Sequence, residues 1–217
     1  MKLCEFTGML IFFVALSMGT TAMAAPFDLL IGDKDGYGFG APDNGTGVVW
    51  PGLGTDGTNY DGRSASEKTA TNGAQITDVY SALFPAYGPN TSPTASVLFP
   101  SVGTITSATL TVAMGDFQGG PVSVNFNGIA ESPWNFSDGF GVTKTRTFVL
   151  SASEIAAANA AGSFQINLDG SALQDFIAFD WFELSGNSTA VPESAALLLL
   201  GLSITGLAPF RKRFRND

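Results

Sequence analysis

The segment Gly-Pro-Val-Ser-Val-Asn-Phe-Asn-Gly at positions 120–128 carries the clearest structural pattern in this chain. Val122, Val124 and Phe126 alternate with polar residues, and a two-residue period is typical of a strand with one face in a core. The Asn-Gly pair that follows favours positive backbone φ angles, which predicts a tight turn. We therefore expect an antiparallel sheet at this point of the chain.

Similar alternation of apolar and polar residues extends over the second half of the chain. Further strands are predicted at residues 95–99, 105–114, 145–150, 162–168 and 175–184. By contrast, residues 26–90 contain one short apolar run, Phe-Asp-Leu-Leu-Ile, among Gly, Asp and Asn clusters, so this part is expected to be rich in loops. The pattern predicts an all-β, antiparallel sandwich.

Two short helices are predicted beside the strands. Ser151 and Glu154 have the spacing of a capping box, and good helix formers follow until Gly162, a residue type that commonly ends helices. This helix is expected to cover one open end of the sandwich. A second helix is predicted before Pro85, where apolar residues are spaced as one helical face: Ile76, Val79, Tyr80, Leu83 and Phe84.

Missing residue types exclude several classes of chemistry. The chain contains no histidine, and its single cysteine is Cys4. Ser-His-Asp and Cys-His catalysis, disulfides and the usual zinc sites are therefore excluded for the body of the protein. A glycosidase needs only two carboxyl groups, so that class stays open as an alternative, although no spacing of acids points to it. A non-catalytic protein is expected.

Charge is unevenly distributed along the chain. Residues 25–190 include sixteen acidic and five basic residues, a net charge of −11. A surface of this sign repels nucleic acid and attracts divalent cations. We therefore expect no nucleic-acid partner. The abundance of Gly, Thr, Ser and Asn is typical of a β-rich exported domain.

Residues 1–24 have the order of a secretory signal peptide. Lys2 precedes an apolar stretch, and Ala22 and Ala24 have the small side chains that signal peptidase selects. Cleavage after Ala24 is expected, because cleavage one residue later would place Pro26 next to the broken bond. A retained membrane anchor is the alternative.

Residues 191–217 form a second targeting segment. Val191-Pro192-Glu193 is followed by the uncharged residues 194–210, which as a helix would be about 25 Å long, close to the roughly 30 Å of a membrane core. The basic cluster at 211–215 would stay on the cytoplasmic side, leaving the preceding domain outside. A transmembrane helix is therefore predicted at 194–210.

This tail resembles the PEP-CTERM sorting signal of Gram-negative bacteria, a segment also labelled as an ice-binding protein C-terminal domain. The resemblance implies recognition by an exosortase, a membrane peptidase that cuts near the Pro-Glu element and passes the protein to the cell surface or the exopolysaccharide matrix of a biofilm. The residues that match the signal are Val191, Pro192 and Glu193 for recognition and Arg211, Lys212, Arg213 and Arg215 for stop-transfer. Ser194 departs from the pattern, in which a second proline is common.

The order of elements in the last part of the body resembles the jelly-roll sandwich of galactose-binding-like domains and several carbohydrate-binding modules. Those families often close with an aromatic-rich strand that contains aspartate, to which Asp175, Asp180 and Trp181 correspond. The resemblance implies a jelly-roll fold and association with glycans such as exopolysaccharide.

An acidic loop near the start of the body is a candidate calcium site. Asp33 and Asp35 are two residues apart and precede a glycine, so a sharply bending chain can direct both carboxylates at one ion. Asp56 and Asp61 lie in a second acidic loop that could complete the site in space. The alternative is that both loops are surface turns with solvated acids.

Trp134 and Asn135 are candidate ligand residues in an aromatic loop at 131–141. Sugars bind where a flat aromatic ring lies beside hydrogen-bonding amides. The alternative is that Trp134 belongs to the core, as most aromatic residues must in a chain with 18 phenylalanines.

Together these features predict three segments: a signal peptide at 1–24, a jelly-roll β-sandwich at 25–190 and a sorting tail at 191–217. The predicted function is that of an exported, non-catalytic surface or extracellular-matrix protein with a structural or glycan-associating role. The alternative is a dedicated carbohydrate-binding module, and a carboxylate-based glycosidase is a third hypothesis.

Overall fold

The fold was determined as a computed structural model that describes residues 24–51, 60–69, 76–80, 83–84 and 92–189. Residues 1–23 of the predicted signal peptide, the predicted sorting tail with its transmembrane helix, and Asp56 lie outside these residues. Ala24–Ser188 form one unit. Within the described ranges, no helix has the length and apolar character needed to cross a membrane.

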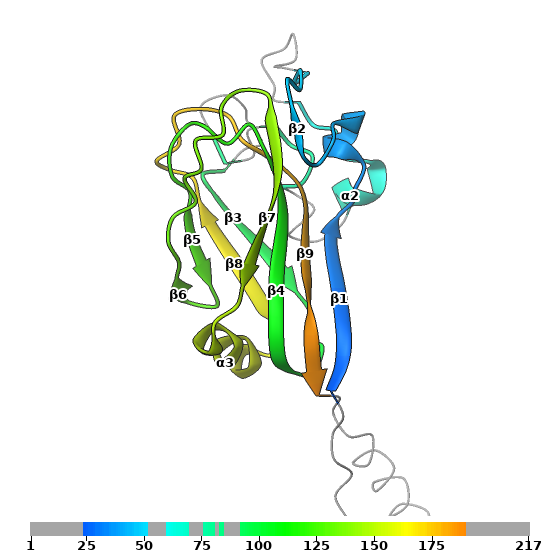
Figure 1. The fold of residues 1–217 in the computed structure, drawn as a ribbon, viewed down its shortest axis with the longest axis vertical. Helices are drawn as coiled ribbons and strands as arrows, with labels where there is room; N and C mark the ends of the chain where they lie inside the picture. Colours follow the sequence, from blue (N-terminus) through cyan, green and yellow to red (C-terminus); the bar gives the residue numbers. More distant parts are fainter. Residues whose placement is uncertain (1–23, 52–59, 70–75, 81–82, 85–91, 190–217) are drawn as a thin grey trace, which may run out of the picture. The chain divides into compact units, whose positions relative to one another are not determined.

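Two antiparallel sheets face each other and form a jelly-roll β-sandwich (Figure 1). The five-stranded sheet has the order β1 (Ala24–Gly32), β9 (Ala178–Thr189), β4 (Thr104–Gly115), β7 (Val142–Val149) and β2 (Gly45–Thr46). The four-stranded sheet has the order β3 (Thr94–Phe99), β8 (Phe164–Asp169), β5 (Ser123–Phe126) and β6 (Ile129–Ala130). From β3 onward the chain passes repeatedly between the two sheets. The predicted fold class is confirmed.

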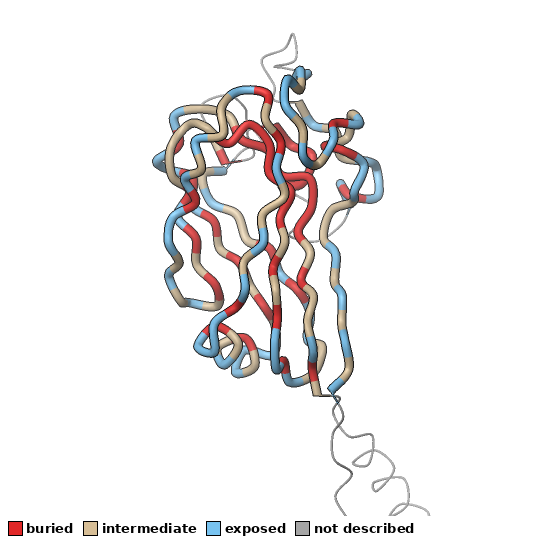
Figure 2. The backbone as a smooth tube through the Cα atoms, in the orientation of Figure 1, coloured by how far each residue is buried: buried red, intermediate tan, exposed pale blue. Residues whose placement is uncertain are grey.

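The core lies between the sheets, where the inward faces of the strands are buried (Figure 2). The period-two pattern of β5 predicted this face correctly, because Val122, Val124 and Phe126 are 0%, 3% and 2% exposed. The Asn-Gly turn is also confirmed: Asn127 and Gly128 have φ angles of 48° and 90° and connect β5 to β6. Local periodicity was sufficient here because each strand has one apolar face.

Helix α3 (Ala152–Ala161) confirms the predicted capping box. The Ser151 side chain accepts a hydrogen bond from the Glu154 backbone N–H, while the Glu154 side chain accepts one from the Ser151 N–H. Gly162 ends the helix with a φ of 68°, a left-handed conformation that glycine adopts at little cost. The helix covers one end of the sandwich (Figure 1).

The helix predicted around residues 76–84 is wrong over its described part. Thr77 forms a parallel bridge with Phe179, and Val79 forms an antiparallel bridge with Asp61, so residues 76–80 pair with two other segments instead of forming a helix. All five residues are buried, so the spacing of the apolar members Ile76, Val79 and Tyr80 resembled one face of a helix without marking an exposed and a buried side. Short helices lie elsewhere, at α2 (Ala65–Thr69) and at the irregular turn η1 (Gly36–Gly40).

Strand β1 was not predicted, because its apolar run is short and is followed by a glycine-rich loop. It pairs with β9 at the edge of the five-stranded sheet. Phe27, Leu29 and Ile31 pack against the core, while the residues between them are exposed. Because β1 and β9 are neighbours of opposite direction, β1 begins and β9 ends at the same end of the sheet (Figure 1).

The side chains of Glu131 and Glu154 interact at the start of α3. Their interaction predicts that the stability of the domain depends on pH. The pKa of Glu131 is raised to about 7, because its carboxyl group shares a hydrogen bond with Glu154 and is partly buried. A raised pKa means that the fold favours the protonated form of Glu131. The stabilisation by this protonated carboxyl group is therefore complete below about pH 4.5 and is lost as the pH rises through 7.

Glu131→Gln keeps a hydrogen-bond donor without needing a proton. The variant is expected to be more stable than the wild type at pH 8, by about 1 kcal/mol after allowance for solvent screening. Near pH 5 the two proteins should have similar melting temperatures. Thermal unfolding at both pH values measures this difference, and an equal difference at the two pH values would contradict the shared proton.

Candidate metal centre

Four aspartates converge at the end of the five-stranded sheet where β1 ends and β9 begins. Asp33, Asp35, Asp78 and Asp180 each place one carboxylate oxygen within 4.8 Å of the oxygens of the other three. Oxygens on opposite sides of one calcium ion are about 4.8 Å apart, since each lies about 2.4 Å from the ion. The spacing of the cluster therefore fits a single Ca²⁺ ion.

Asp33 and Asp35 are positioned by the sharp turn that follows β1. Gly32 has a φ of 85°, and a Cβ atom at this position would lie 2.4 Å from the backbone oxygen of Asp180. Only glycine allows the end of β1 to approach β9 so closely. Asp35 then caps the next turn, where its Oδ1 accepts a hydrogen bond of 2.7 Å from the Gly38 N–H.

Asp78 and Asp180 are brought together by backbone pairing between distant segments. The Asp78 N–H donates to the Phe179 carbonyl at 2.7 Å, which places Asp78 beside the first residues of β9. The Asp78 carbonyl accepts from the Gly62 N–H at 2.8 Å. Asp78 is held with a φ of 57°, an uncommon conformation for a residue with a side chain. The fold thus holds this carboxylate at a fixed position.

The two inner carboxylates are buried without full hydrogen bonding. Asp78 and Asp180 are 1% and 0% exposed. One oxygen of Asp180 accepts a hydrogen bond of 3.1 Å from the Tyr37 N–H. Its other oxygen and both oxygens of Asp78 accept none from the part of the chain that the structure describes. An unpaired buried carboxylate costs several kcal/mol, so a cation is the natural partner for these oxygens.

The pKa values of three of these acids are displaced in the same direction. Burial raises the pKa of Asp78, and the neighbouring charge of Asp180 raises it further. Burial also raises the pKa of Asp180 and of Asp33. These shifts express the cost of placing several negative charges together away from water, and a divalent cation would remove that cost.

Two basic side chains near the cluster, Lys34 and Arg63, form ion pairs with acids outside it. The Lys34 ammonium pairs with Glu183 at 2.6 Å and lies over the Trp181 ring, 4.3 Å from its centroid. Arg63 pairs with Asp61 at 2.9 Å. Glu67 adds negative charge beside the cluster, since it raises the pKa of both Asp33 and Asp78. The local field therefore favours a cation.

The structure brings together only part of the set of calcium ligands predicted from the sequence. Asp33 and Asp35 are in the cluster, whereas Asp56 lies outside the described residues. Asp61 does not join the cluster, because its carboxylate pairs with Arg63 and with Lys68, and this pairing lowers its pKa. That part of the prediction is corrected.

Sequence reasoning did not identify Asp78 or Asp180 as metal ligands. Both are single acids inside apolar runs, Ile-Thr-Asp-Val-Tyr at 76–80 and Ile-Ala-Phe-Asp-Trp-Phe at 177–182. A run that is apolar on both faces, without two-residue alternation, favours burial of the acid within it, and a buried carboxylate needs a partner. The two apolar runs in the sequence therefore contained enough information to identify Asp78 and Asp180 as candidates.

The predicted sugar contact at Trp134 does not agree with the structure. Trp134 is 3% exposed, and its ring stacks on Phe148 with centroids 5.0 Å apart. Its backbone forms a bridge with Val122, which draws the loop into the four-stranded sheet. Asn135 is exposed next to it, but a buried ring presents no face to a sugar. Trp134 therefore belongs to the core.

Comparison with known proteins identifies no family. No protein-family model and no curated protein matches the chain. Among solved structures, the chain is similar to latent PorU from Porphyromonas gingivalis at 12% identity and a TM-score of 0.36, covering 79% of this chain and 14% of that one. This chain therefore spans a small part of PorU.

Two further solved structures are carbohydrate-binding modules. A CBM36-1 domain of a xylanase from the hindgut metagenome of Trinervitermes trinervoides has 12% identity and a TM-score of 0.33, with 74% of this chain and 98% of that one covered. A CBM36 module in complex with calcium and xylotriose has 15% identity and a TM-score of 0.27, with 43% and 72% covered. These low values carry no information about the ligand of this chain.

Proposed function

We propose that this chain is an exported, non-catalytic protein of the cell surface or extracellular matrix, and that its β-sandwich holds a calcium ion and associates with glycans. The observation that carries the proposal is the cluster of Asp33, Asp35, Asp78 and Asp180, in which buried carboxylate oxygens lack hydrogen-bond partners. A site of this kind contributes to stability and orientation rather than to bond cleavage.

Calcium fits this site better than a transition metal. All four ligands are carboxylates, which are hard oxygen donors, and the protein has no histidine and a single cysteine at position 4. Calcium sites in extracellular modules bind in the range of about 10⁻⁴ to 10⁻³ M, well above the calcium levels that cytosolic sensors detect. A calcium-holding domain therefore suits export, in agreement with the signal sequence at 1–24.

The sorting tail supplies the proposed route to the surface. Signal peptidase would cleave after Ala24, and an exosortase would act near Val191-Pro192-Glu193 after the helix at 194–210 enters the membrane. Within the sandwich, β1 begins and β9 ends at one end of the five-stranded sheet (Figure 1). The acidic cluster lies where β1 ends and β9 begins, at the other end of these two strands.

The protein recovered from the bacterial surface fraction, in its processed form, is mixed with insoluble and soluble polysaccharides to test the proposal. We expect it to co-sediment with at least one polysaccharide in calcium buffer and to release no new reducing ends. Tight binding to a single glycan would favour the dedicated carbohydrate-binding module. Release of reducing ends that is lost in a carboxylate variant would overturn the non-catalytic proposal in favour of a glycosidase.

A further inference from the structure

The outer face of the four-stranded sheet carries a groove of about 410 Å³. All four strands, β3, β8, β5 and β6, contribute to its lining. Across four strands the sheet is about 14 Å wide, because neighbouring strands lie about 4.8 Å apart. The groove lies on a different sheet from the acidic cluster, which is at the end of the five-stranded sheet.

Strand register arranges the polar side chains of this groove in two rows. Ser96, Asn167 and Asn125 lie opposite one another on β3, β8 and β5. Two positions along the strands, a second row contains Thr94, Asp169 and Ser123. Each row points away from the core, because the alternate residues Val97, Leu168 and Val124 are buried.

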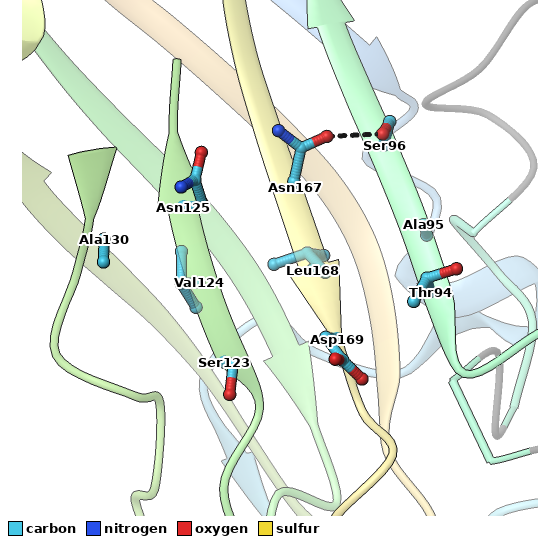
Figure 3. Close-up of a pocket in the computed structure, with 10 residues that line it drawn as sticks. All are labelled: Thr94, Ala95, Ser96, Ser123, Val124, Asn125, Ala130, Asn167, Leu168 and Asp169. Carbon is cyan, nitrogen blue, oxygen red and sulfur yellow. Dashed lines mark hydrogen bonds between the residues drawn. The ribbon is translucent and has the colours of Figure 1, made fainter. Parts of the chain in front are cut away.

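The central row already contains a hydrogen-bonded pair. The Ser96 hydroxyl donates to the Asn167 side-chain oxygen at 2.7 Å. Figure 3 shows Asn167 between Ser96 and Asn125, with its amide nitrogen on the side of Asn125. This bond orients the Asn167 amide, so its nitrogen is presented as a donor toward the middle of the groove.

The chemistry of the lining selects among polymers. Asp169 is the one ionisable side chain among the lining residues for which the structure gives positions. Hydrogen bonds from Ser171 lower its pKa, so it remains an anion and an acceptor. Within the described part of the chain, no basic side chain lines the groove to offset this charge. An anionic polymer would be repelled here, whereas a neutral polymer with many hydroxyl groups could both donate to and accept from the two rows.

A protein partner fits this lining poorly. Protein interfaces are anchored by aromatic side chains and arginine in desolvated pockets. The lining residues that the structure describes include neither, and their apolar members are Ala95, Ala130, Val124 and Leu168. The groove thus offers amides and hydroxyls in a regular array, and little to anchor a second protein.

We infer that the groove on the outer face of β3, β8, β5 and β6 binds a neutral polysaccharide through hydrogen bonds to the Ser96–Asn167–Asn125 row, without aromatic stacking. The inference rests on the proposed function and specifies its ligand class and its surface. Binding by hydrogen bonds alone is weak for each sugar, which suits a matrix protein that meets its polymer at high local concentration.

Affinity electrophoresis of the full chain in gels containing xylan, mannan or dextran tests the inference, with polygalacturonate as the anionic comparison. Asn167→Ala removes the central amide and is expected to weaken binding to the preferred neutral polymer about 5- to 10-fold. Ser123→Tyr places a bulky ring in the groove and should abolish retardation. Thr147→Tyr is the matched control, since Thr147 is exposed on the other sheet, and it should change nothing.

The outcomes separate this inference from the proposed function. Melting temperatures close to that of the wild type show that the variants fold. Unchanged retardation of both Asn167→Ala and Ser123→Tyr would overturn the groove as the binding surface while leaving glycan association intact. Stronger retardation by polygalacturonate than by any neutral polymer would also overturn it. A wild-type protein that binds none of the polymers would overturn both proposals.

Discussion

Trp134→Ala is expected to destabilise the domain by about 3–5 kcal/mol, the usual cost of removing a large aromatic side chain from a packed core. The ring is 3% exposed, stacks on Phe148 and also meets Phe179, with centroids 6.4 Å apart. Its removal would leave a cavity between β7 and the loop that joins β6 to β7. Chemical denaturation of the full chain, monitored by circular dichroism, measures the loss.

Phe140→Ala provides the matched control for this prediction. Phe140 lies in the same loop but is 67% exposed, so its replacement should change the free energy of unfolding by less than about 0.5 kcal/mol. If Trp134→Ala melted like the wild type but lost glycan binding, the core assignment would be wrong and the sugar contact predicted from the sequence would be restored.

We expect the second large effect when calcium is removed, which should lower the melting temperature of the domain. At a calcium concentration about 100 times the dissociation constant, the ion would stabilise the fold by about 2.7 kcal/mol. For a domain of this size that corresponds to a rise in melting temperature of roughly 5–10 °C. Differential scanning calorimetry with calcium and with a chelator measures the difference.

Asp78→Asn sharpens the calcium experiment because two effects of opposite sign are expected. The amide cannot replace a charged ligand, so the calcium-dependent rise in melting temperature should disappear. In chelator, however, the variant should melt above the wild type, because one of several crowded negative charges has been removed from a buried site.

Asp61→Asn is the control for calcium binding, since Asp61 pairs with Arg63 and lies outside the cluster. It should lose a little stability and keep the full response to calcium. Equal melting of the wild type with and without chelator would reject the ion site. A loss of the response in Asp61→Asn as well as in Asp78→Asn would show that the ligand set is different from the one assigned.

Features that depend on neighbours in sequence were predicted well. The alternation in β5, the turn at Asn127-Gly128 and the capping box of α3 were all confirmed. Each is a local pattern in which one face of a short segment, or one hydrogen bond across three residues, sets the conformation. The same reasoning failed at residues 76–80, because a segment buried on every side has no face to reveal its period.

The candidate metal centre depends on contacts between remote parts of the chain. The turn that carries Asp33 and Asp35 could be recognised from two acids beside a glycine, but 143 positions separate Tyr37 from the Asp180 carboxylate that it meets. Asp61 was assigned to the cation site for a similar reason. Its carboxylate pairs with Arg63 instead, and this pairing depends on how the two loops fold against β9.

Composition and local order were therefore enough to establish an acidic, antiparallel β-rich chain without histidine, because charge, residue type and strand period are properties of short segments. Which carboxylates share a site, and whether Trp134 faces sugar or core, depended on the three-dimensional fold. The physical reason is that electrostatic crowding and burial act between groups that are close in space, and pairing of β1, β9 and residues 76–80 is what brings those groups together.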